Sequence, residues 1–331
     1  VSAGAIGFTT SRTELHTTRE EQAMPGTYAD ENELLGIGKA IGDLGGEAIF
    51  GLVSDFTNWQ EEMDWMKRLS IDNNCQINFV LFFREESDWP RVQAQLEFCR
   101  KAAVEGAQLI PHIGARPVNL LLSWDGTIHP FSFHANYAPL SILSHEERLN
   151  ELRKTQVRAA ILAEELPLMG DDFMDTIIGG YDKLYELGTP PNYEPGPQDS
   201  IAAKAREAGI SPQQYCYDLM MERNGKNVVY FPCFGYGAND LSRQVELLED
   251  EATVISLADT GAHCGVLCDA SVPTQMLSFY VRDRERGHRL GLEQAVKMQT
   301  MDTARCVGLN DRGTLQVGMK ADLNLIDFGI G

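Results

Sequence analysis

Short apolar runs alternate with longer amphipathic stretches over the first third of the chain. The apolar runs have the length of strands, and the amphipathic stretches have the apolar spacing of helices that pack on a sheet. Strands separated by helices in this way form parallel sheets. The expected strands are Ala5–Thr9, Glu47–Val53, Gln76–Phe83 and Leu109–Ile113, and the expected helices are Asp30–Leu44, Gln60–Ser70 and Trp89–Gly106.

This pattern predicts an α/β protein, built either as a β/α barrel or as a doubly wound sheet. Asp30 is a suitable N-cap for the first helix, and Gly45 and Gly46 can end it. The run Gln76–Phe83 is largely apolar, as expected of a strand that is covered on both faces. No Gly-x-Gly-x-x-Gly motif follows an expected strand, which argues against a dinucleotide-binding sheet.

The regular alternation stops between about residues 121 and 224. This segment holds a helix around His145–Leu166, the proline-rich stretch Pro190–Pro197 and a helix over Ser200–Ala208. So long an insertion in a barrel is usually a substrate lid or an oligomer contact. A homo-oligomer is therefore one expected assembly.

Regular elements return after the insertion. Asn227–Phe231 and Thr253–Leu257 are expected to be the closing strands of the barrel. Leu292–Val307 is expected to be the terminal helix, with Gly308 as its stop. From Asp311 to Asp327 the period changes from helical to alternating, which predicts a glycine-turned β-hairpin.

Composition restricts the partners. The net charge of −20 would repel nucleic acid phosphates. No stretch approaches the ~20 uncharged apolar residues of a membrane helix, so no membrane partner is expected. The start of the chain is apolar but lacks a basic region, unlike a signal peptide. The seven cysteines are odd in number and scattered, which indicates a reducing, cytoplasmic location rather than a disulfide framework.

The C-terminal stretch carries the first specific motif. Thr303-Ala304 is followed by Gly308-Leu309, Asp311-Arg312-Gly313 and Ala321-Asp322-Leu323. This series resembles the end of amidohydrolase-superfamily proteins, in which the chain leaves a TIM-like β/α barrel and returns to a small β-sandwich. The resemblance implies that residues 1–308 belong to the barrel and that residues 309–331 begin the return to the sandwich.

Two further segments resemble one branch of that superfamily. Gly4–Thr13, with Pro25–Ala29 downstream, is similar to a mid-barrel motif of the N-acyl-D-amino-acid deacylases, or D-aminoacylases. Ser256–His263 is similar to the last barrel strand of the same group, and Arg282-Asp283-Arg284 follows it. The resemblance extends over essentially the whole chain.

The resemblance also implies that part of the barrel lies outside this sequence. The first barrel strand of the family carries a His-x-His metal motif, and no such motif occurs here. The chain is therefore expected to be a C-terminal portion that begins about halfway around the barrel and lacks roughly four strands. A naturally truncated or mis-started reading frame is an alternative. Such a fragment is expected to be inactive by itself.

Asp259 is the strongest catalytic candidate. It follows an apolar strand at the end where barrel enzymes place their catalytic groups. In the resembled family this aspartate touches the metal and moves a proton from the attacking water to the leaving amine. A carboxylate suits both tasks. The alternative is a strand-end aspartate that caps the turn at Thr260-Gly261.

Four other residues are candidates for the site. His263 could bind the metal or the substrate, or it could be a structural hydrogen-bonding residue. His112 ends an expected strand and could be a metal ligand. Arg116 and Arg12 could hold a substrate carboxylate, because a guanidinium binds carboxylates through two parallel hydrogen bonds. For both arginines a surface salt bridge is the alternative.

The resemblance limits the number of metals. Known D-aminoacylases carry a metal-binding histidine at the end of each of two mid-barrel strands, whereas Leu52 and a residue near Val80 stand in those places here. A two-zinc site is therefore not expected. One Zn²⁺ per active site is predicted, held by the upstream His-x-His motif, an upstream thiolate and Asp259.

These patterns predict a metal-dependent hydrolase that cleaves the amide bond of small N-acyl-D-amino acids. A non-catalytic scaffold or binding subunit of the same fold is the first alternative, favoured by the missing mid-barrel histidines. A hydrolase of another C–N bond, such as a cyclic amide, is the second.

Overall fold

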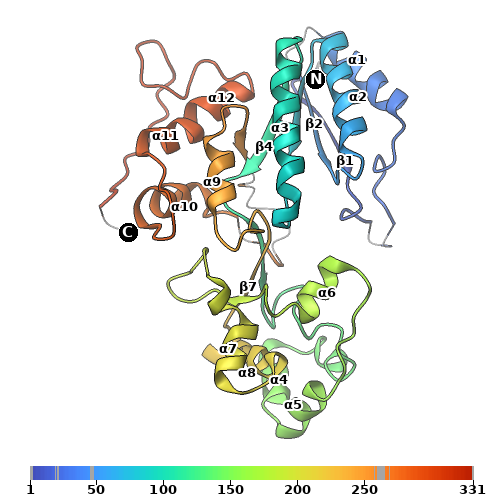
Figure 1. Cartoon of the computed structure of the whole chain (residues 1–331), viewed down its shortest axis with the longest axis vertical. Coiled ribbons are helices and arrows are strands. Elements are labelled where there is room, and N and C mark those ends of the chain that lie inside the picture. Colours follow the sequence, from blue (N-terminus) through green and yellow to red (C-terminus); the bar gives the residue numbers. More distant parts are fainter. Residues whose placement is uncertain are drawn as a thin grey trace. The chain divides into compact units, whose positions relative to one another are not determined.

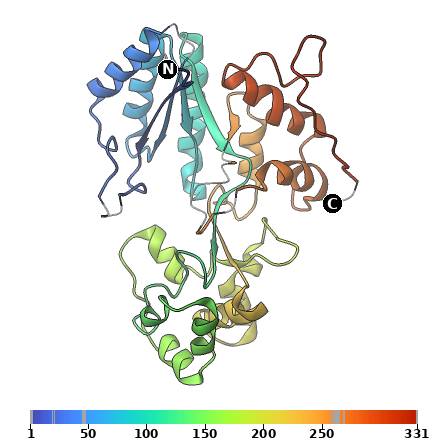
Figure 2. The same cartoon turned by 180° about the vertical axis from the view of Figure 1, so that it is seen from behind.

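The computed structural model describes residues 3–18, 20, 22–44, 48–256, 258, 265–267 and 269–329 (Figures 1 and 2). The chain divides into two compact units. Unit 1 comprises Val1–Arg116, Ser242–Leu257 and Val272–Gly331, and unit 2 comprises Pro117–Leu241 and Ala258–Ser271. The assignment of residues 1–308 to a barrel and of 309–331 to a sandwich is not tested by this division and stays a prediction.

Unit 1 contains the predicted parallel sheet. Its strands lie in the order β1-β2-β3-β4-β8, and every neighbouring pair is parallel. The strands are β1 (Gly7–Arg12), β2 (Ile49–Ser54), β3 (Gln76–Val80), β4 (Leu109–Gly114) and β8 (Val254–Ser256). Successive strands thus lie side by side, whereas the strand order of a doubly wound sheet reverses. The order is that of a β/α barrel, and the sheet is not closed within the described residues.

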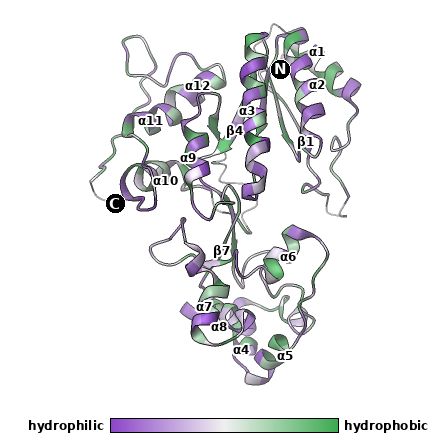
Figure 3. Cartoon of the chain, in the orientation of Figure 1, coloured by the Kyte–Doolittle hydropathy of each residue, from purple (hydrophilic) through white to green (hydrophobic). Residues whose placement is uncertain are grey.

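Three helices alternate with these strands: α1 (Glu31–Gly42), α2 (Trp59–Asn73) and α3 (Trp89–Val104). Asp30 caps α1 as predicted, because its side chain accepts a hydrogen bond from the Asn32 backbone N–H at 2.9 Å. Gly106 follows α3 with a φ of +97°, a conformation that favours glycine. Hydrophilic and hydrophobic residues alternate along α1, α2 and α3 in Figure 3, as expected of helices with one buried stripe.

The two faces of the sheet have different neighbours. The ring of Phe50 packs edge-on against Trp65 of α2 at 6.2 Å, and the Ser54 hydroxyl lies 3.2 Å from Glu62 Oε2 of the same helix. We call this side the helix face. Side chains alternate along a strand, so Val53 points to the opposite, inner face. The same alternation and register place Asn78 and His112 on the inner face.

The last part of unit 1 is helical. The elements are α9 (Ser242–Glu249), α10 (Val272–Gln275), a π-helix η4 (Met276–Asp283), α11 (Leu292–Lys297), a π-helical segment η5 (Met298–Asp302) and α12 (Thr303–Cys306). The last three confirm the predicted terminal helix, and Gly308 ends it with a φ of +73°.

The β-hairpin predicted over residues 311–327 does not form in the described part of the C-terminal stretch. Residues 309–329 contain turns and irregular backbone without a strand. Val317 and Leu325 are fully exposed, so the alternating apolar side chains pack on no sheet. A two-stranded hairpin needs such packing to be stable in water.

Unit 2 is built around a small antiparallel sheet in the order β5-β7-β6. Its strands are β5 (Val118–Leu122), β6 (Tyr185–Glu186) and β7 (Val229–Phe234). Its helices are α4 (His145–Leu152), α5 (Thr155–Leu162), α6 (Asp172–Gly179), α7 (Ile201–Ala208) and α8 (Pro212–Gly225). The helix predicted over 145–166 is therefore two helices, and the one predicted over 200–208 is confirmed.

The assignment of Asn227–Phe231 as a closing barrel strand is wrong. This segment overlaps β7, whose partners are β5 and β6 in unit 2. An apolar run is compatible with either sheet, and only the pairing distinguishes them. The other predicted closing strand is confirmed, since β8 pairs in parallel with β4.

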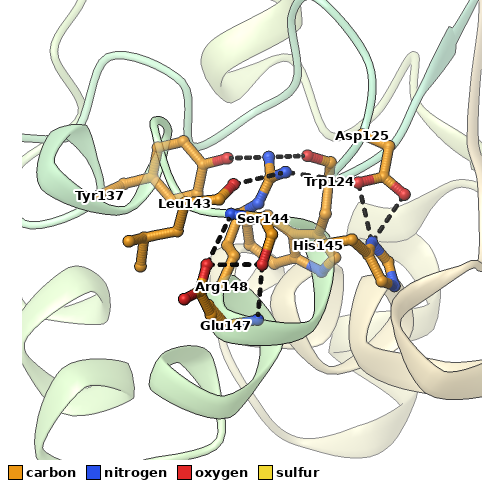
Figure 4. A network of polar contacts seen from close by, with 8 residues as sticks. All are labelled: Trp124, Asp125, Tyr137, Leu143, Ser144, His145, Glu147 and Arg148. Carbon is orange, nitrogen blue, oxygen red and sulfur yellow. Dashed lines mark hydrogen bonds and ion pairs between the residues drawn. The ribbon is translucent and has the colours of Figure 1, made fainter.

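Trp124 lies at the centre of the core of unit 2. It is fully buried, it stacks on Phe131 at 5.4 Å and on Tyr137 at 5.6 Å, and it meets the edge of Tyr217 at 5.4 Å. Its backbone carbonyl accepts a hydrogen bond from Arg148 Nη1 (Figure 4).

Arg148 belongs to α4 and joins this aromatic cluster to the start of the helix (Figure 4). Its guanidinium also donates to the Tyr137 hydroxyl at 3.3 Å and to the Leu143 carbonyl at 3.5 Å. Ser144 and Glu147 form a capping box at the N-terminus of α4. The hydrogen bonds from Ser144 lower the pKa of Glu147.

No helix in the described ranges combines the length and the apolar character needed to cross a membrane. The five cysteines that the structure describes are free thiols.

Candidate active site at the carboxyl ends of the strands

The carboxyl ends of β1, β2, β3, β4 and β8 meet at one edge of the parallel sheet, since all five strands run in the same direction. Barrel enzymes place their reacting groups at this edge. Three of the predicted site residues are described: Arg12 is the last residue of β1, and His112 and Arg116 lie within two residues of the end of β4.

Arg12 is the last residue of β1 and lies on the helix face. Its Nε and Nη2 donate to the Glu62 carboxylate, the shortest contact being 2.6 Å, and its Nη1 donates to the Ala29 carbonyl at 2.9 Å. The guanidinium also lies 5.7 Å from the centre of the Trp65 ring. Because strand alternation directs Arg12 toward α2, the structure places it in a structural ion pair rather than on the inner face.

We expect Arg12→Met to lower the free energy of unfolding by about 3 kcal/mol, because Glu62 would keep a mostly buried charge without its partner. The two side chains are only 17% and 14% exposed. In denaturant titrations the double variant Arg12→Met/Glu62→Met should lose clearly less than the sum of the single variants. A normal stability of Arg12→Met together with a raised KM would instead support a substrate-binding role for Arg12.

His112 lies on the inner face of β4. Its Nε2 is 3.5 Å from the Cys306 Sγ of α12, and Asn78 Nδ2 lies 3.7 Å from the same sulfur. Gln76 Nε2 donates to the Cys306 carbonyl at 2.7 Å. Burial lowers the pKa of His112 and raises that of Cys306, so both are neutral near pH 7.

The described residues do not by themselves fit a metal ion. Among them, no group of three or more histidine, cysteine, aspartate or glutamate side chains is placed to hold one. His112 has a thiol rather than a carboxylate beside it. Within these ranges, no carboxylate or further imidazole is placed with His112 to complete a metal site, so its role as a ligand stays a prediction.

Leu52, predicted to stand in place of a metal-binding histidine, lies on the helix face of the sheet. Leu52 is buried on the helix face with Phe50, so it does not point toward the inner face. The residues on the inner face at this level are Val53 and Val80. Both are apolar, so neither β2 nor β3 offers a metal-binding side chain there.

Arg116 lies two residues beyond the end of β4 and is 3% exposed. Its Nη1 donates to the side-chain oxygen Oε1 of Gln275 at 3.0 Å, and Gln275 is the last residue of α10. Nearby, the Gln244 side chain of α9 donates to the carbonyl of Gly114. Gly114 is paired in register with Ser256 of β8, so this polar cluster lies at the junction of β4 and β8.

Asp259 and His263 lie outside the described residues. Ser256, the last residue of β8, is the described strand position closest before Asp259. The structure therefore shows only that β8, the strand before Asp259 in the sequence, pairs with β4. The catalytic role of Asp259 stays a prediction.

Two histidines of the insertion, His129 and His134, belong to the core of unit 2. His129 is 2% exposed, its Nδ1 accepts from the Phe131 backbone N–H at 3.2 Å, and burial lowers its pKa to about 3. His134 is fully buried and contacts Gln213 at 2.9 Å. Both are packing residues.

The sequence analysis missed Glu62, Gln244 and Gln275. Glu62 lies in the first turn of α2, where an acidic residue is ordinary and carries no signal of a specific partner. The two glutamines stand in segments without a motif. Their role depends on the packing of α9 and α10 at the end of β4.

Solved structures share the fold at low sequence identity. A D-aminoacylase variant in complex with copper chloride aligns with a TM-score of 0.50 and 13% identity, over 97% of this chain and 52% of its own. A structure from work on the binuclear metal centre of D-aminoacylase gives the same values. The N-acyl-D-glutamate deacylase from Bordetella bronchiseptica, with zinc and a phosphonate inhibitor, aligns with a TM-score of 0.45 and 15% identity, over 90% and 50%.

The chain therefore spans about half the length of these solved proteins. No curated protein matches the sequence. The sequence model of the amidohydrolase family matches residues 2–330, which is nearly the entire chain. This match agrees with the sequential parallel sheet of unit 1, and the chain belongs to the amidohydrolase family.

Proposed function

We propose that the protein is a metal-dependent hydrolase that cleaves the amide bond of N-acyl-D-amino acids. The observation that supports this proposal is the parallel pairing of β8 with β4, because β8 ends at Ser256, three residues before Asp259 in the sequence. Family membership and the shared fold support the class of reaction. The D-amino-acid substrate is proposed from the family resemblance.

Four of the five candidate residues have a role in this proposal, whereas Arg12 is held in its ion pair with Glu62. Asp259 takes a proton from the attacking water and passes it to the leaving amine. Arg116 binds the substrate carboxylate, and His263 binds the metal or the substrate. As a metal ligand, His112 is less favoured than Asp259, because the imidazole of His112 contacts Cys306.

One Zn²⁺ per active site is proposed as the cofactor from the family resemblance alone. It would lower the pKa of a bound water. Cytoplasmic location and homo-oligomerisation also stay predictions, as does the inactivity of this chain by itself.

The substrate proposal is tested by assaying the full-length protein with N-acetyl-D- and N-acetyl-L-amino acids. We expect amine release from the D-series, at least tenfold faster than from the L-series. If a cyclic amide were cleaved and neither series were turned over, the proposed substrate would be wrong, but the proposed class of reaction, C–N bond hydrolysis, would stand.

A non-catalytic scaffold is the second candidate function. The apolar side chains of Val53 and Val80 on the inner face of β2 and β3 favour it, since in the resembled family each of two mid-barrel strands ends in a metal-binding histidine. Metal analysis of the purified full-length protein separates the two. Zinc near one per chain supports the hydrolase, and a metal-free protein without turnover supports the scaffold.

A further inference from the structure

Gln275 has a buried amide with only one of its two ends satisfied. The residue is 6% exposed, and its Oε1 accepts the hydrogen bond from Arg116 Nη1 at 3.0 Å. Its Nε2 is buried and has no hydrogen-bond partner among the residues that the structure describes. A buried donor without a partner is unfavourable unless something binds it.

The orientation of this amide follows from its neighbour. If the amide were turned over, its NH₂ group would face the Arg116 guanidinium, and two donors would oppose each other. Arg116 therefore holds Oε1 toward itself and Nε2 away. Nε2 is bonded to the same carbon atom as Oε1, so it points in another direction but still lies near the guanidinium at the end of β4.

A second buried polar atom occurs at the same edge of the sheet. The Ser256 hydroxyl at the end of β8 is buried, and it too lacks a hydrogen-bond partner within the described ranges. Gly114, two residues before Arg116, is the register partner of Ser256. The junction of β4 and β8 thus collects a cation, an oriented amide donor and a hydroxyl.

We infer that Gln275 is a specificity-determining residue that donates its Nε2–H to the substrate carboxylate, next to Arg116. This inference rests on the proposed function and names the group that the site selects, the α-carboxylate of an N-acyl amino acid. A carboxylate has two acceptor oxygens, so it can accept from the guanidinium and from the amide together. A neutral amide analogue has one acceptor oxygen and carries no charge for Arg116.

The test uses a substitution that separates structure from recognition. Gln275→Glu keeps an oxygen acceptor for Arg116, so the contact between β4 and α10 is retained, but it replaces the donor with an anion. Gln275→Met removes both functions. The matched control is Gln108→Glu, which makes the same charge change at an exposed position just before β4, at the opposite end of the strand.

Binding of N-acetyl-D-leucine and N-acetyl-D-leucinamide to the full-length protein is measured by titration calorimetry in the Asp259→Asn background, in which hydrolysis during the titration is slow. We expect Gln275→Glu to weaken binding of the acid by about 100-fold, because a donor is lost and a like charge is added. Binding of the amide should change by less than about twofold. Gln108→Glu should leave both affinities unchanged, and Gln275→Met should weaken the acid by about tenfold.

Equal losses for the acid and the amide in Gln275→Glu would overturn the inference, as would no loss for either or no binding of the acid to the protein that keeps Gln275. Turnover of N-acetyl-D-leucine that is insensitive to Gln275→Glu would reject the inference and leave the proposed function standing. Selective acid binding that Gln275→Glu abolishes, without any turnover, would support the carboxylate site and reject the hydrolase.

Discussion

Replacing Asp259 by Asn is expected to lower kcat/KM for an N-acyl-D-amino acid by about 10³-fold, the usual contribution of a positioned general acid–base group. Asn has the same size and keeps hydrogen-bonding atoms, but it cannot accept the proton of the attacking water. The effect should therefore appear in kcat more than in KM. Steady-state kinetics of the full-length protein measure both.

The pH profile gives a second test of Asp259. The acidic limb of the wild-type profile reports the pKa of the catalytic base, and this limb should be absent from the residual activity of Asp259→Asn. Asp302→Asn is the matched control, since Asp302 forms an ion pair with Lys297 at 2.7 Å that should contribute little to stability. Full activity of Asp259→Asn, with a lowered stability, would show that Asp259 caps the turn at Thr260 instead.

Replacing Trp124 by Ala is expected to destabilise unit 2 by about 4 kcal/mol, since it removes the largest fully buried side chain of that core. Phe131, Tyr137 and Tyr217 would all lose ring contacts at once. Phe131 and Tyr137 lie close to Trp124 in the sequence, whereas Tyr217 belongs to the distant helix α8, so a small local shift cannot restore the packing of all three rings. Trp59→Ala, at a partly exposed position in the first turn of α2, should cost much less.

Hydrogen exchange measured on peptides of each unit separates this effect from global unfolding. Peptides of β5, α4 and α8 should lose protection in Trp124→Ala, whereas those of β2 and β3 should keep it. Equal loss in both units would mean that they unfold as one cooperative body. A bulk denaturation curve alone would not distinguish these cases, because a chain with two units need not unfold in two states.

The local elements of unit 1 could be predicted from the sequence. Every expected strand and helix from Ala5 to Gly106 occurs, with ends displaced by a few residues. The physical reason is that hydrophobic period and capping act within one element: Asp30 caps its own helix, and Gly106 ends one by its own backbone conformation. The family could be predicted as well, because its motifs are contiguous in the chain.

Only the tertiary structure decided which strands pair and toward which face of the sheet each side chain points. An apolar run such as β7 could form a strand in either sheet. Its place in unit 2 is decided by pairing with β5 and β6, which are more than forty residues away in the sequence. Arg12 ends β1 and Arg116 follows β4, yet the first is directed toward Glu62 on the helix face and the second toward Gln275. Strand type and composition are local properties, whereas the partner of a side chain depends on which distant element packs against it.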